Sequence, residues 1–577
     1  MKQFLIGLLV FYVQNASAQL SPFEKSEGKE TATYSEAISW YKHLDKSSVK
    51  VNMREMGMTD AGYPLHLVMV SSDGKFDPAA WHQQKKVVIM INNGIHPGEP
   101  DGIDASMMMV RDIVNKKITL PSNVALAFIP VYNIGGCLNR NSYTRANQNG
   151  PVEYGFRGNA QNLDLNRDFT KSDSKNARSF AEIFHYLNPD ILIDNHVSDG
   201  ADYQHTMTLI TTQYNKLGPS LGTWVRESLE PKLYKNMGSK GWDMIPYVDF
   251  GATDFSKGMT MFMDPPRYSS GYAALFNTIS FMPETHMLKP YAERVKSTYD
   301  LMVTFIEEGS SHAAEIKSQR SKATREWMER KAVPLKWKLD KMGSKQIVFK
   351  GFEADSASSE ATGLSKLFYN HNKPFTRSIQ FFHQFNEDGM VNLPRAYVIP
   401  AGWWSVIDLL RINKVKMTVL QKDSSFDVST TIIGEYKSSA TPYEKHHKNY
   451  AVKTQVKKEN HKFLKGDVII YLNQSANRYL VEMLEPTGDD SFFAWNFFDG
   501  ILQQKEGYSD YRWENLAAEE LKKDLRLRQA LEAKKAAEPN FAADSRAILA
   551  FIYKNSPYYE KAHNQYPVYR IEFQELE

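Results

Sequence analysis

The chain has 577 residues, of which 42% are hydrophobic, 24% are charged and 12% are aromatic. This balance is typical of a globular protein with a sizeable core, and it excludes a disordered, collagen-like or coiled-coil chain. Lys and Arg number 70 against 67 for Asp and Glu, so the chain lacks the broad positive field of nucleic-acid-binding proteins, and we expect no nucleic acid partner. At about 100 to 200 residues for each domain, the length predicts two to four domains.

The first eighteen residues are typical of an export signal. Lys2 is followed by an apolar stretch over residues 4–13 and then by Ala16-Ser17-Ala18, the order of charge, apolar run and small residues found in such signals. We expect cleavage after Ala18 and a secreted or periplasmic protein. The apolar stretch is shorter than the roughly 20 residues that a membrane-spanning helix needs, and no later stretch reaches that length, so we expect no membrane span.

Residues 30–310 alternate apolar runs with helix-like stretches, a pattern that predicts a doubly wound α/β domain with a mixed, largely parallel sheet. The expected strands lie at residues 86–91, 124–131, 191–193 and 278–282. After the first strand, Pro100 is expected to open a helix that carries residues 105–114. Ligands of such sheets bind beyond the carboxyl ends of the strands, so the loops that follow the strands are the expected place for a site.

The remainder of the chain has a different pattern. Residues 309–330 are rich in Ser, Lys and Arg and predict a solvated helix or connector at a domain boundary. Residues 333–490 predict a β-rich, sandwich-like domain. Its expected strands are residues 416–420, 430–436, 467–472 and 479–484. Residues 491–577 predict a helical C-terminal extension, because residues 514–535 and 542–553 have helical period.

Two histidines and a glutamate stand where expected strands end. His96 and Glu99 follow the first strand three residues apart, and His196 follows the third. Imidazole nitrogen and carboxylate oxygen are zinc ligands, and a catalytic zinc has three protein ligands and leaves one position to water. A His-x-x-Glu pair alone is weak evidence for a metal site, and a lone histidine is more often part of a hydrophobic core. Together the three residues predict one catalytic zinc ion.

Residues 157–169 are dense in groups that hold anions. The segment contains Arg157, Asp164, Asn166 and Arg167. A guanidinium matches a carboxylate with two parallel hydrogen bonds, and a neighbouring amide can donate to the same group. The segment therefore predicts a site for an anionic end of a substrate, with a surface network of Arg and Asp as the alternative.

Glu284 stands just beyond the apolar run of residues 278–282. A glutamate that is partly desolvated at such a place can act as a general base and take a proton from water that a zinc ion activates. A solvated residue at the sheet edge is the alternative. We expect a catalytic role for Glu284.

Taken in their order along the chain, these residues resemble the zinc metallocarboxypeptidase family of carboxypeptidases A and D. The resemblance covers roughly residues 34–308, about half of the chain, and it rests on the following set: His96-x-x-Glu99, Arg157, Asp164-Leu165-Asn166-Arg167, His196 and Glu284. It implies one zinc ion on His96, Glu99 and His196. It also implies that Glu284 is the general base and later gives a proton to the leaving amine.

The resemblance implies further roles around the zinc. Arg157 would polarise the scissile carbonyl and stabilise the oxyanion of the tetrahedral intermediate. Asn166 and Arg167 would bind the free C-terminal carboxylate of a peptide, which makes the protein an exopeptidase. Asp164 would orient the first zinc histidine.

Two features depart from the family pattern. The mobile tyrosine that closes over the substrate carboxylate has two candidate counterparts, Tyr268 and Tyr272, of which we prefer Tyr272. In addition, Glu99 and His196 are only 97 residues apart, fewer than in the digestive enzymes. The loops that form the specificity pocket are therefore expected to be missing or rebuilt, and the preferred C-terminal residue stays open.

The sequence thus favours a secreted zinc carboxypeptidase that hydrolyses the C-terminal peptide bond of peptides. One alternative is a zinc hydrolase of the same fold that acts on cell-wall peptides or N-acyl amino acids. A further alternative is a non-catalytic exported binding protein that works through its C-terminal half. The sequence makes no prediction of the oligomeric state.

Overall fold

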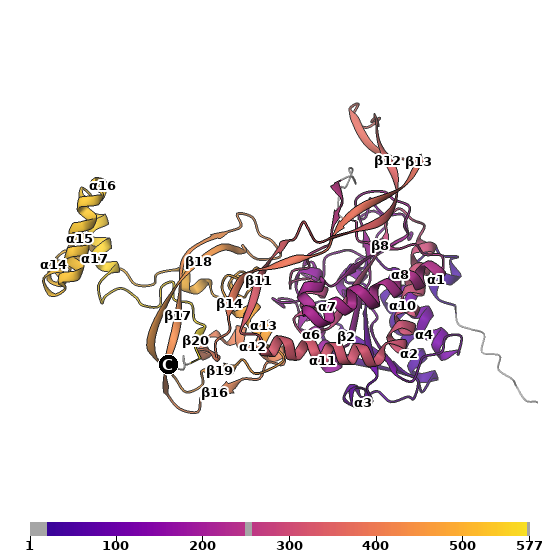
Figure 1. Cartoon of the computed structure of the whole chain (residues 1–577), viewed down its shortest axis with the longest axis horizontal. Coiled ribbons are helices and arrows are strands. Elements are labelled where there is room, and N and C mark those ends of the chain that lie inside the picture. Colours follow the sequence, from indigo (N-terminus) through magenta and orange to yellow (C-terminus); the bar gives the residue numbers. More distant parts are fainter. Residues whose placement is uncertain (1–19, 249–256, 574–577) are drawn as a thin grey trace, which may run out of the picture. The chain divides into compact units, whose positions relative to one another are not determined.

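The computed structural model describes residues 20–248 and 257–573, and the chain divides into two compact units (Figure 1). The first unit contains the described residues up to Glu329 together with Trp337–Asp388, and the second contains Arg330–Lys336 and the described residues from Gly389 onwards. The export signal predicted at residues 1–18 lies outside the described residues. Of the helices in the described ranges, none has both the length and the apolar character needed to cross a membrane.

A mixed sheet forms the centre of the first unit. Its strands are β1 (Val51–Met58), β2 (Pro64–Ser71), β3 (Val87–Asn92), β4 (Val124–Ile129), β5 (Ile191–Asp194), β6 (His196–Ser198), β7 (Met207–Thr211), β8 (Ile245–Pro246) and β10 (Ile279–His286). Their order is β1-β2-β4-β3-β5-β10-β7-β8, with β6 paired to β10. Neighbours among β4, β3, β5 and β10 run parallel. Strand β2 is antiparallel to both of its neighbours, whereas β7 is antiparallel to β10 and parallel to β8. The four strands expected from the sequence correspond to β3, β4, β5 and β10.

Helices cover both faces of this sheet. On one face lie α2 (Tyr34–Ser47), α4 (Asp101–Val114) and α10 (Tyr291–Ser311), and on the other lie α3 (Pro78–Gln83), α6 (Lys175–Leu187) and α9 (Ser269–Ala274). Within β3, Ile89 and Ile91 pack into the first core cluster and Val88 and Met90 into the second, because successive side chains of a strand point to opposite faces. Burial on both faces explains the unbroken apolar runs in the sequence, and the predicted doubly wound mixed sheet is confirmed.

The remaining helical elements of the first unit lie around this core (Figure 1). They are α1 (Pro22–Lys25), α5 (Ile134–Leu138), η1 (Leu165–Arg167), η2 (Tyr214–Leu217), α7 (Gly218–Trp224), η3 (Val225–Leu229), α8 (Glu230–Ser239) and α11 (Ala313–Glu329). The expected helix with residues 105–114 corresponds to α4, which has Pro100 at its N-cap. Most of the expected solvated connector at residues 309–330 corresponds to α11.

The first unit also contains a long two-stranded ribbon, visible beyond the main sheet in Figure 1. Strand β12 (Ser344–Ser358) is antiparallel to β13 (Ser365–Phe382), and β13 pairs with the short β9 (Met259–Thr260). Gln204 Nε2 donates a hydrogen bond to the Gly351 carbonyl over 2.8 Å, which ties the ribbon to the sheet unit. Residues 337–388 therefore lie in the first unit, whereas the sequence pattern predicts them in the β-rich domain at 333–490. These contacts join segments far apart in the chain, which a local pattern cannot reveal.

Asp190 connects the end of α6 to β5 and also holds α11 against the sheet. Its buried carboxylate accepts hydrogen bonds from Lys317 and from Arg320, whose Nη1 lies 2.6 Å from Oδ1. Burial by itself raises the pKa of Asp190, but Arg320 and Lys317 lower that pKa below its usual value. The helix that the sequence indicated as solvated is therefore anchored by a buried ion pair.

We expect Asp190→Asn to lower the stability of the first unit at pH 7 by about 3 to 5 kcal/mol, because Lys317 and Arg320 lose their counter-charge. The folded-state pKa of Asp190 lies below the unfolded value of about 3.9. The carboxylate therefore stabilises the fold fully above about pH 3.9, and this stabilisation is lost as the pH falls through the folded-state pKa. Thermal unfolding of both proteins between pH 7 and pH 2 measures this effect. A difference in stability that stays constant over that range would contradict it.

The second unit contains a six-stranded sheet with helices. Its strands are β15 (Ala396–Ile399), β16 (Thr418–Val419), β17 (Ser424–Ser438), β18 (Asn449–Phe463), β19 (Val468–Tyr471) and β20 (Tyr569–Ile571), in the order β16-β19-β15-β20-β17-β18. Strands β11 (Ala332–Leu339) and β14 (Phe385–Asn392) form a separate two-stranded sheet, whose residues divide between the two units. The predicted β-rich region is thus confirmed, but the long strands of this unit form one sheet rather than the two facing sheets of a sandwich.

The helices of the second unit include one whose sequence pattern predicts a strand. They are η5 (Ala401–Trp403), α12 (Trp404–Ile412), α13 (Asn477–Leu484), η6 (Asp499–Leu502), α14 (Asp510–Lys523), α15 (Leu525–Ala537), α16 (Pro539–Ala542) and α17 (Ser545–Lys554). The strand expected at residues 479–484 is part of α13, in which every side chain is buried, and a short apolar run cannot distinguish a buried strand from a buried helix. Helices α14 to α17 confirm the helical C-terminal region.

Candidate active site

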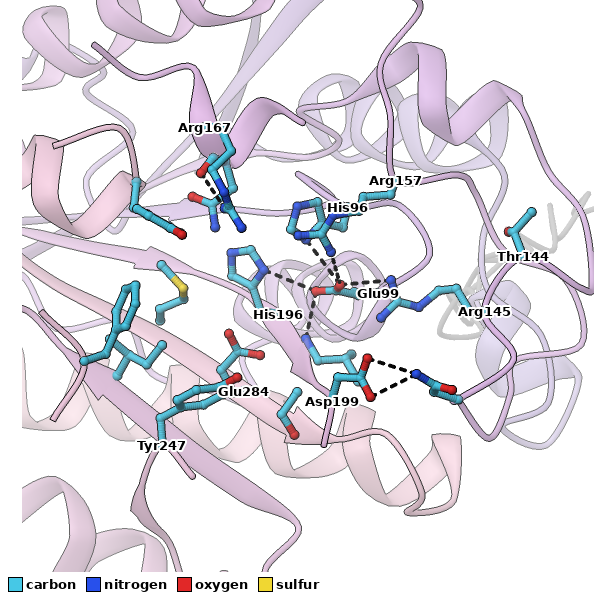
Figure 2. Close-up of a pocket in the computed structure, with 18 of the residues that line it drawn as sticks. His96, Glu99, Thr144, Arg145, Arg157, Arg167, His196, Asp199, Tyr247 and Glu284 are labelled. Atoms are coloured by element: carbon cyan, nitrogen blue, oxygen red, sulfur yellow. Dashed lines mark hydrogen bonds and ion pairs between the residues drawn. The ribbon is translucent and has the colours of Figure 1, made fainter. Parts of the chain in front are cut away.

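The predicted site residues meet at the carboxyl-end edge of the parallel strands. His96 and Glu99 follow β3, residues 130–167 follow β4, His196 follows β5, and Glu284 lies near the end of β10. Because parallel strands present their carboxyl ends at one edge of the sheet, these segments converge. They line one pocket of about 490 Å³ (Figure 2).

His96, Glu99 and His196 form a buried group within this pocket. One potential ligand atom from each lies within 4.8 Å of the others. Nδ1 of His96 is 3.2 Å from Oε1 of Glu99, and Nδ1 of His196 is 3.2 Å from Oε2. Nδ1 of His96 is buried and makes no hydrogen bond. Over residues 20–248 and 257–573, no other three His, Cys, Asp or Glu side chains form such a group.

The second nitrogen of each imidazole contacts a carboxylate. Nε2 of His96 lies 2.9 Å from Oδ1 of Asp164, and Nε2 of His196 lies 3.1 Å from Oδ2 of Asp194. Such carboxylates fix the tautomer and the orientation of ligating histidines, and here they leave both Nδ1 atoms facing Glu99. Asp164 was predicted from the sequence, whereas Asp194 was missed. Its position two residues before His196, at the end of a strand, is a signal that could have identified it, since such residues share a face of an extended chain.

The charges around the buried group favour a cation. Burial by itself lowers the pKa of His196, but Asp194, Glu99 and Glu284 together raise that pKa well above its ordinary value. The carboxylates that stabilise a protonated imidazole also stabilise a divalent cation that takes the place of the proton. Two imidazole nitrogens and one carboxylate, with a buried ring nitrogen that lacks a hydrogen bond, therefore fit a zinc ion.

We expect Asp194→Asn to weaken zinc binding about 10- to 100-fold, because the amide supplies less negative charge to His196 and orients the ring less firmly. Competition with a metal-binding dye measures the dissociation constant. Asp243→Asn is the matched control, since the Asp243 side chain is 59% exposed and outside the pocket. Equal zinc affinities for the wild type and Asp194→Asn would show that Asp194 has no such role.

Glu284 lies beside the same group. It is the direct register partner of His196, in neighbouring parallel strands, and its side chain points into the pocket (Figure 2). Burial raises the pKa of Glu284 to about 8, with Glu99 adding to the rise and with His196 and Arg157 opposing it. A carboxyl group with such a pKa can accept and return a proton near neutral pH.

The predicted anion-binding residues line the pocket as well. Arg157 Nε donates a hydrogen bond to Oδ2 of Asp164 over 3.0 Å. Arg167 Nη1 donates to the carbonyl of Asn166 over 2.8 Å, and its guanidinium carbon lies 4.2 Å from the centre of the Tyr268 ring. The structure therefore brings Arg157, Asn166 and Arg167 to the pocket that holds the histidines.

The preferred tyrosine, Tyr272, does not reach the pocket. Its ring is fully buried in a core cluster with Phe169 and Phe180, and its hydroxyl lies 3.2 Å from Nε2 of His185. Tyr268 and Tyr247 line the pocket instead. The preference for Tyr272 is therefore wrong, because the sequence around a short helix such as α9 does not show which of its sides faces the core.

Two charged groups of the pocket were missed in the sequence. Arg145 Nη1 lies 3.0 Å from Oε1 of Glu99, and its Nε donates to Oε1 of Gln148 over 2.8 Å. A Cβ on Gly98 would lie 2.3 Å from Cδ of Arg145, so glycine makes room for this arginine. The other missed group is Asp199. Both lie in loops, where no periodic pattern marks the position of a side chain.

Residues 37–191 match the sequence model of the zinc carboxypeptidase family. This segment carries His96, Glu99 and the anion-binding residues, while His196 and Glu284 lie beyond it and are joined to it by the fold. The resemblance to zinc carboxypeptidases is therefore confirmed for this segment. No curated protein matches the chain in sequence.

Many solved structures align with about half of the chain, among them three metallocarboxypeptidases from bacteria and an insect. The metallo-carboxypeptidase from Burkholderia cenocepacia is 14% identical, with 48% of this chain and 70% of that chain covered at a TM-score of 0.37. The carboxypeptidase A from Helicoverpa armigera is 15% identical, with 49% of this chain and 74% of that chain covered at a TM-score of 0.37. The metallo-carboxypeptidase from Pseudomonas aeruginosa is 13% identical, with 49% of this chain and 70% of that chain covered at a TM-score of 0.37. That structure is a complex with (2-guanidinoethylmercapto)succinic acid.

Proposed function

We propose that this protein is an exported zinc metallocarboxypeptidase that hydrolyses the C-terminal peptide bond of peptides. The observation that carries the proposal is that one pocket holds a buried His-Glu-His group, a glutamate with a raised pKa and an arginine-asparagine pair. A zinc ion held by His96, Glu99 and His196 would supply a Lewis acid and would lower the pKa of a bound water to about 7.

Glu284 moves the proton in this mechanism. As a carboxylate it takes a proton from the attacking water, and as a carboxylic acid it gives that proton to the nitrogen of the leaving amine. Burial at the end of β10 raises its pKa, which stabilises the protonated form between the two steps. The register contact with His196 keeps the carboxyl group beside the metal-binding side chains.

The arginines orient the substrate. Arg167 and Asn166 bind the terminal carboxylate, and the Tyr268 ring packs against the Arg167 guanidinium at 4.2 Å. Arg157 is 44% exposed at its side chain and is anchored by Asp164. Its remaining donors are placed to hydrogen-bond the scissile carbonyl oxygen and to stabilise the negative charge that develops there.

The test uses pairs of peptides that differ only in a free or an amidated C-terminus. We expect the zinc-loaded wild type to release the last residue from the free peptides alone, as measured by mass spectrometry. Arg167→Ala is expected to raise KM by about 10- to 100-fold, because a charge-assisted contact to the carboxylate is lost. Arg411→Ala, in which a 65% exposed side chain outside the pocket is removed, is the matched control.

Two outcomes would overturn the proposal. Equal cleavage of free and amidated peptides would show that the enzyme does not read a terminal carboxylate. Cleavage of N-acyl amino acids or murein peptides alone, with ordinary peptides left intact, would assign the same site to the alternative substrates.

A further inference from the structure

The pocket has an acidic side chain at the end opposite to the proposed carboxylate site. Figure 2 shows Arg167 and Asp199 on opposite sides of the group formed by His96, Glu99 and His196. Among the residues that line the pocket, Asp199 is the acidic one that belongs neither to the metal-binding group nor to the proposed base. Arg167 thus lies at one end of the pocket and the Asp199 carboxylate at the other, while Arg145, which also lines the pocket, pairs with Glu99.

The contacts of Asp199 leave its charge uncompensated. Asn147 Nδ2 lies 3.0 Å from each carboxylate oxygen, and the backbone N–H of Gly200 donates to Oδ1 over 2.8 Å. Both partners are neutral amides. Across the described part of the chain, no Lys, Arg or His forms an ion pair with Asp199, whereas Arg145 and Arg157 both lie near Glu99. The amides fix the carboxylate in place without neutralising it.

The path of a substrate through the pocket leads to this carboxylate. If the terminal carboxylate lies on Arg167 and the scissile bond lies beside Glu284, the peptide on the acyl side of that bond must leave past the remaining lining residues. The lining residues on the side away from Arg167 include Thr144, Arg145 and Asp199 (Figure 2). A fixed, uncompensated carboxylate along this path attracts a cation and disfavours an anion.

On the basis of the proposed function, we propose that Asp199 selects peptides that carry a cationic group on the acyl side of the scissile bond. Two groups have this chemistry: the α-ammonium of a short peptide and the side chain of an internal Lys or Arg. Each would form an ion pair with Asp199 within the pocket, where the pair is less screened than at an open surface.

The experiment measures binding without turnover, by calorimetry on the zinc-loaded full chain carrying Glu284→Gln. One pair of ligands is Ala-Ala-Phe and acetyl-Ala-Ala-Phe, which tests the α-ammonium. The other is acetyl-Ala-Lys-Phe and its norleucine counterpart, which tests the side chain. We expect the cationic member of at least one pair to bind about five- to tenfold more tightly, with a ratio that declines as salt is raised.

Three further variants in the same background assign the preference to Asp199. Asp199→Asn keeps the shape and removes the charge, and it is expected to bring the ratio close to one. Asp199→Glu keeps the charge and is expected to preserve a preference. Glu153→Gln is the matched control for the loss of one negative charge, because the Glu153 side chain is 62% exposed and outside the pocket; its ratio should equal that of the parent.

Equal binding within both pairs, a ratio that Asp199→Asn leaves unchanged, or no binding of any of these peptides would overturn the inference. Release of phenylalanine by the wild type is a separate readout that tests the proposed function. If the peptides bind with the expected charge preference and the wild type releases no amino acid, the proposed hydrolysis is refuted while the charge selection by Asp199 stands.

Discussion

Glu284→Gln is expected to lower kcat by about 10²- to 10⁴-fold, the usual contribution of a general acid-base group. The amide has nearly the same shape as the carboxyl group, but it cannot take a proton from water or return one to the leaving amine. KM should change little, because Arg167 and Asn166 rather than Glu284 bind the substrate carboxylate. Steady-state hydrolysis of a peptide with a free C-terminus measures both constants.

The control for this prediction is Glu293→Gln, in an exposed residue of α10 outside the pocket, which should match the wild type. Zinc content measured on each purified variant separates a lost base from a lost metal. A Glu284→Gln protein that keeps its zinc and more than a tenth of the wild-type kcat would exclude Glu284 as the base.

The pH dependence of the wild type follows from the same residue. Only the ionised carboxylate can accept a proton, and burial raises the pKa of Glu284 to about 8. As the pH is lowered, activity is therefore expected to fall. The midpoint of this fall should lie above the pKa of about 4.3 of an exposed glutamate. A bound divalent cation lowers the pKa of a neighbouring carboxyl group, so the fall should lie below pH 8. The pH profile of kcat/KM measures it.

The sequence predicted the centre of the site because its residues stand at the ends of strands. Strands β3, β5 and β10 are apolar runs buried on both faces, and His96, His196 and Glu284 stand at or just beyond the ends of those runs. Once the strands were placed, the parallel sheet brought these residues to one edge. The prediction of the ligand set thus depended on positions that the hydrophobic pattern defines.

The groups that the sequence did not predict lie in loops or depend on contacts distant in the chain. Arg145 reaches Glu99 from a loop after β4, and Asp199 faces the pocket from the turn after β6. The ribbon of β12 and β13 joins the first unit through contacts such as that of Gln204 with Gly351. A loop has no period that fixes the direction of a side chain, so the tertiary structure alone determines where these groups lie.

Removal of the metal is expected to abolish hydrolysis, and His196→Ala is expected to have the same effect even in excess zinc. The variant loses one of three protein ligands, and it removes the imidazole that contacts both Asp194 and Glu99. Activity after treatment with a chelator, and after addition of zinc, measures the first effect, and metal analysis of His196→Ala measures the second. Full activity of a metal-free preparation would refute the assignment.

Metal binding is also expected to raise the stability of the first unit. Four carboxylates, those of Glu99, Asp164, Asp194 and Glu284, surround the two histidines, and a divalent cation reduces their mutual repulsion in the folded state. A ligand that binds only the folded state adds about 4 kcal/mol when its free concentration is 1,000 times its dissociation constant. The thermal unfolding midpoint should therefore rise with zinc for the wild type and remain unchanged for His196→Ala.

The pH dependence of that zinc effect provides an independent check on the ligands. Zinc binds an imidazole only through a nitrogen that carries no proton, and the neighbouring carboxylates raise the pKa of His196 well above its ordinary value. Protons therefore compete with zinc at this site up to a higher pH than they would at an isolated histidine, and the stabilisation by zinc should decline as the pH is lowered from 8 to 6. Stabilisation that does not depend on pH in this range would mean that the zinc is held by groups other than these histidines.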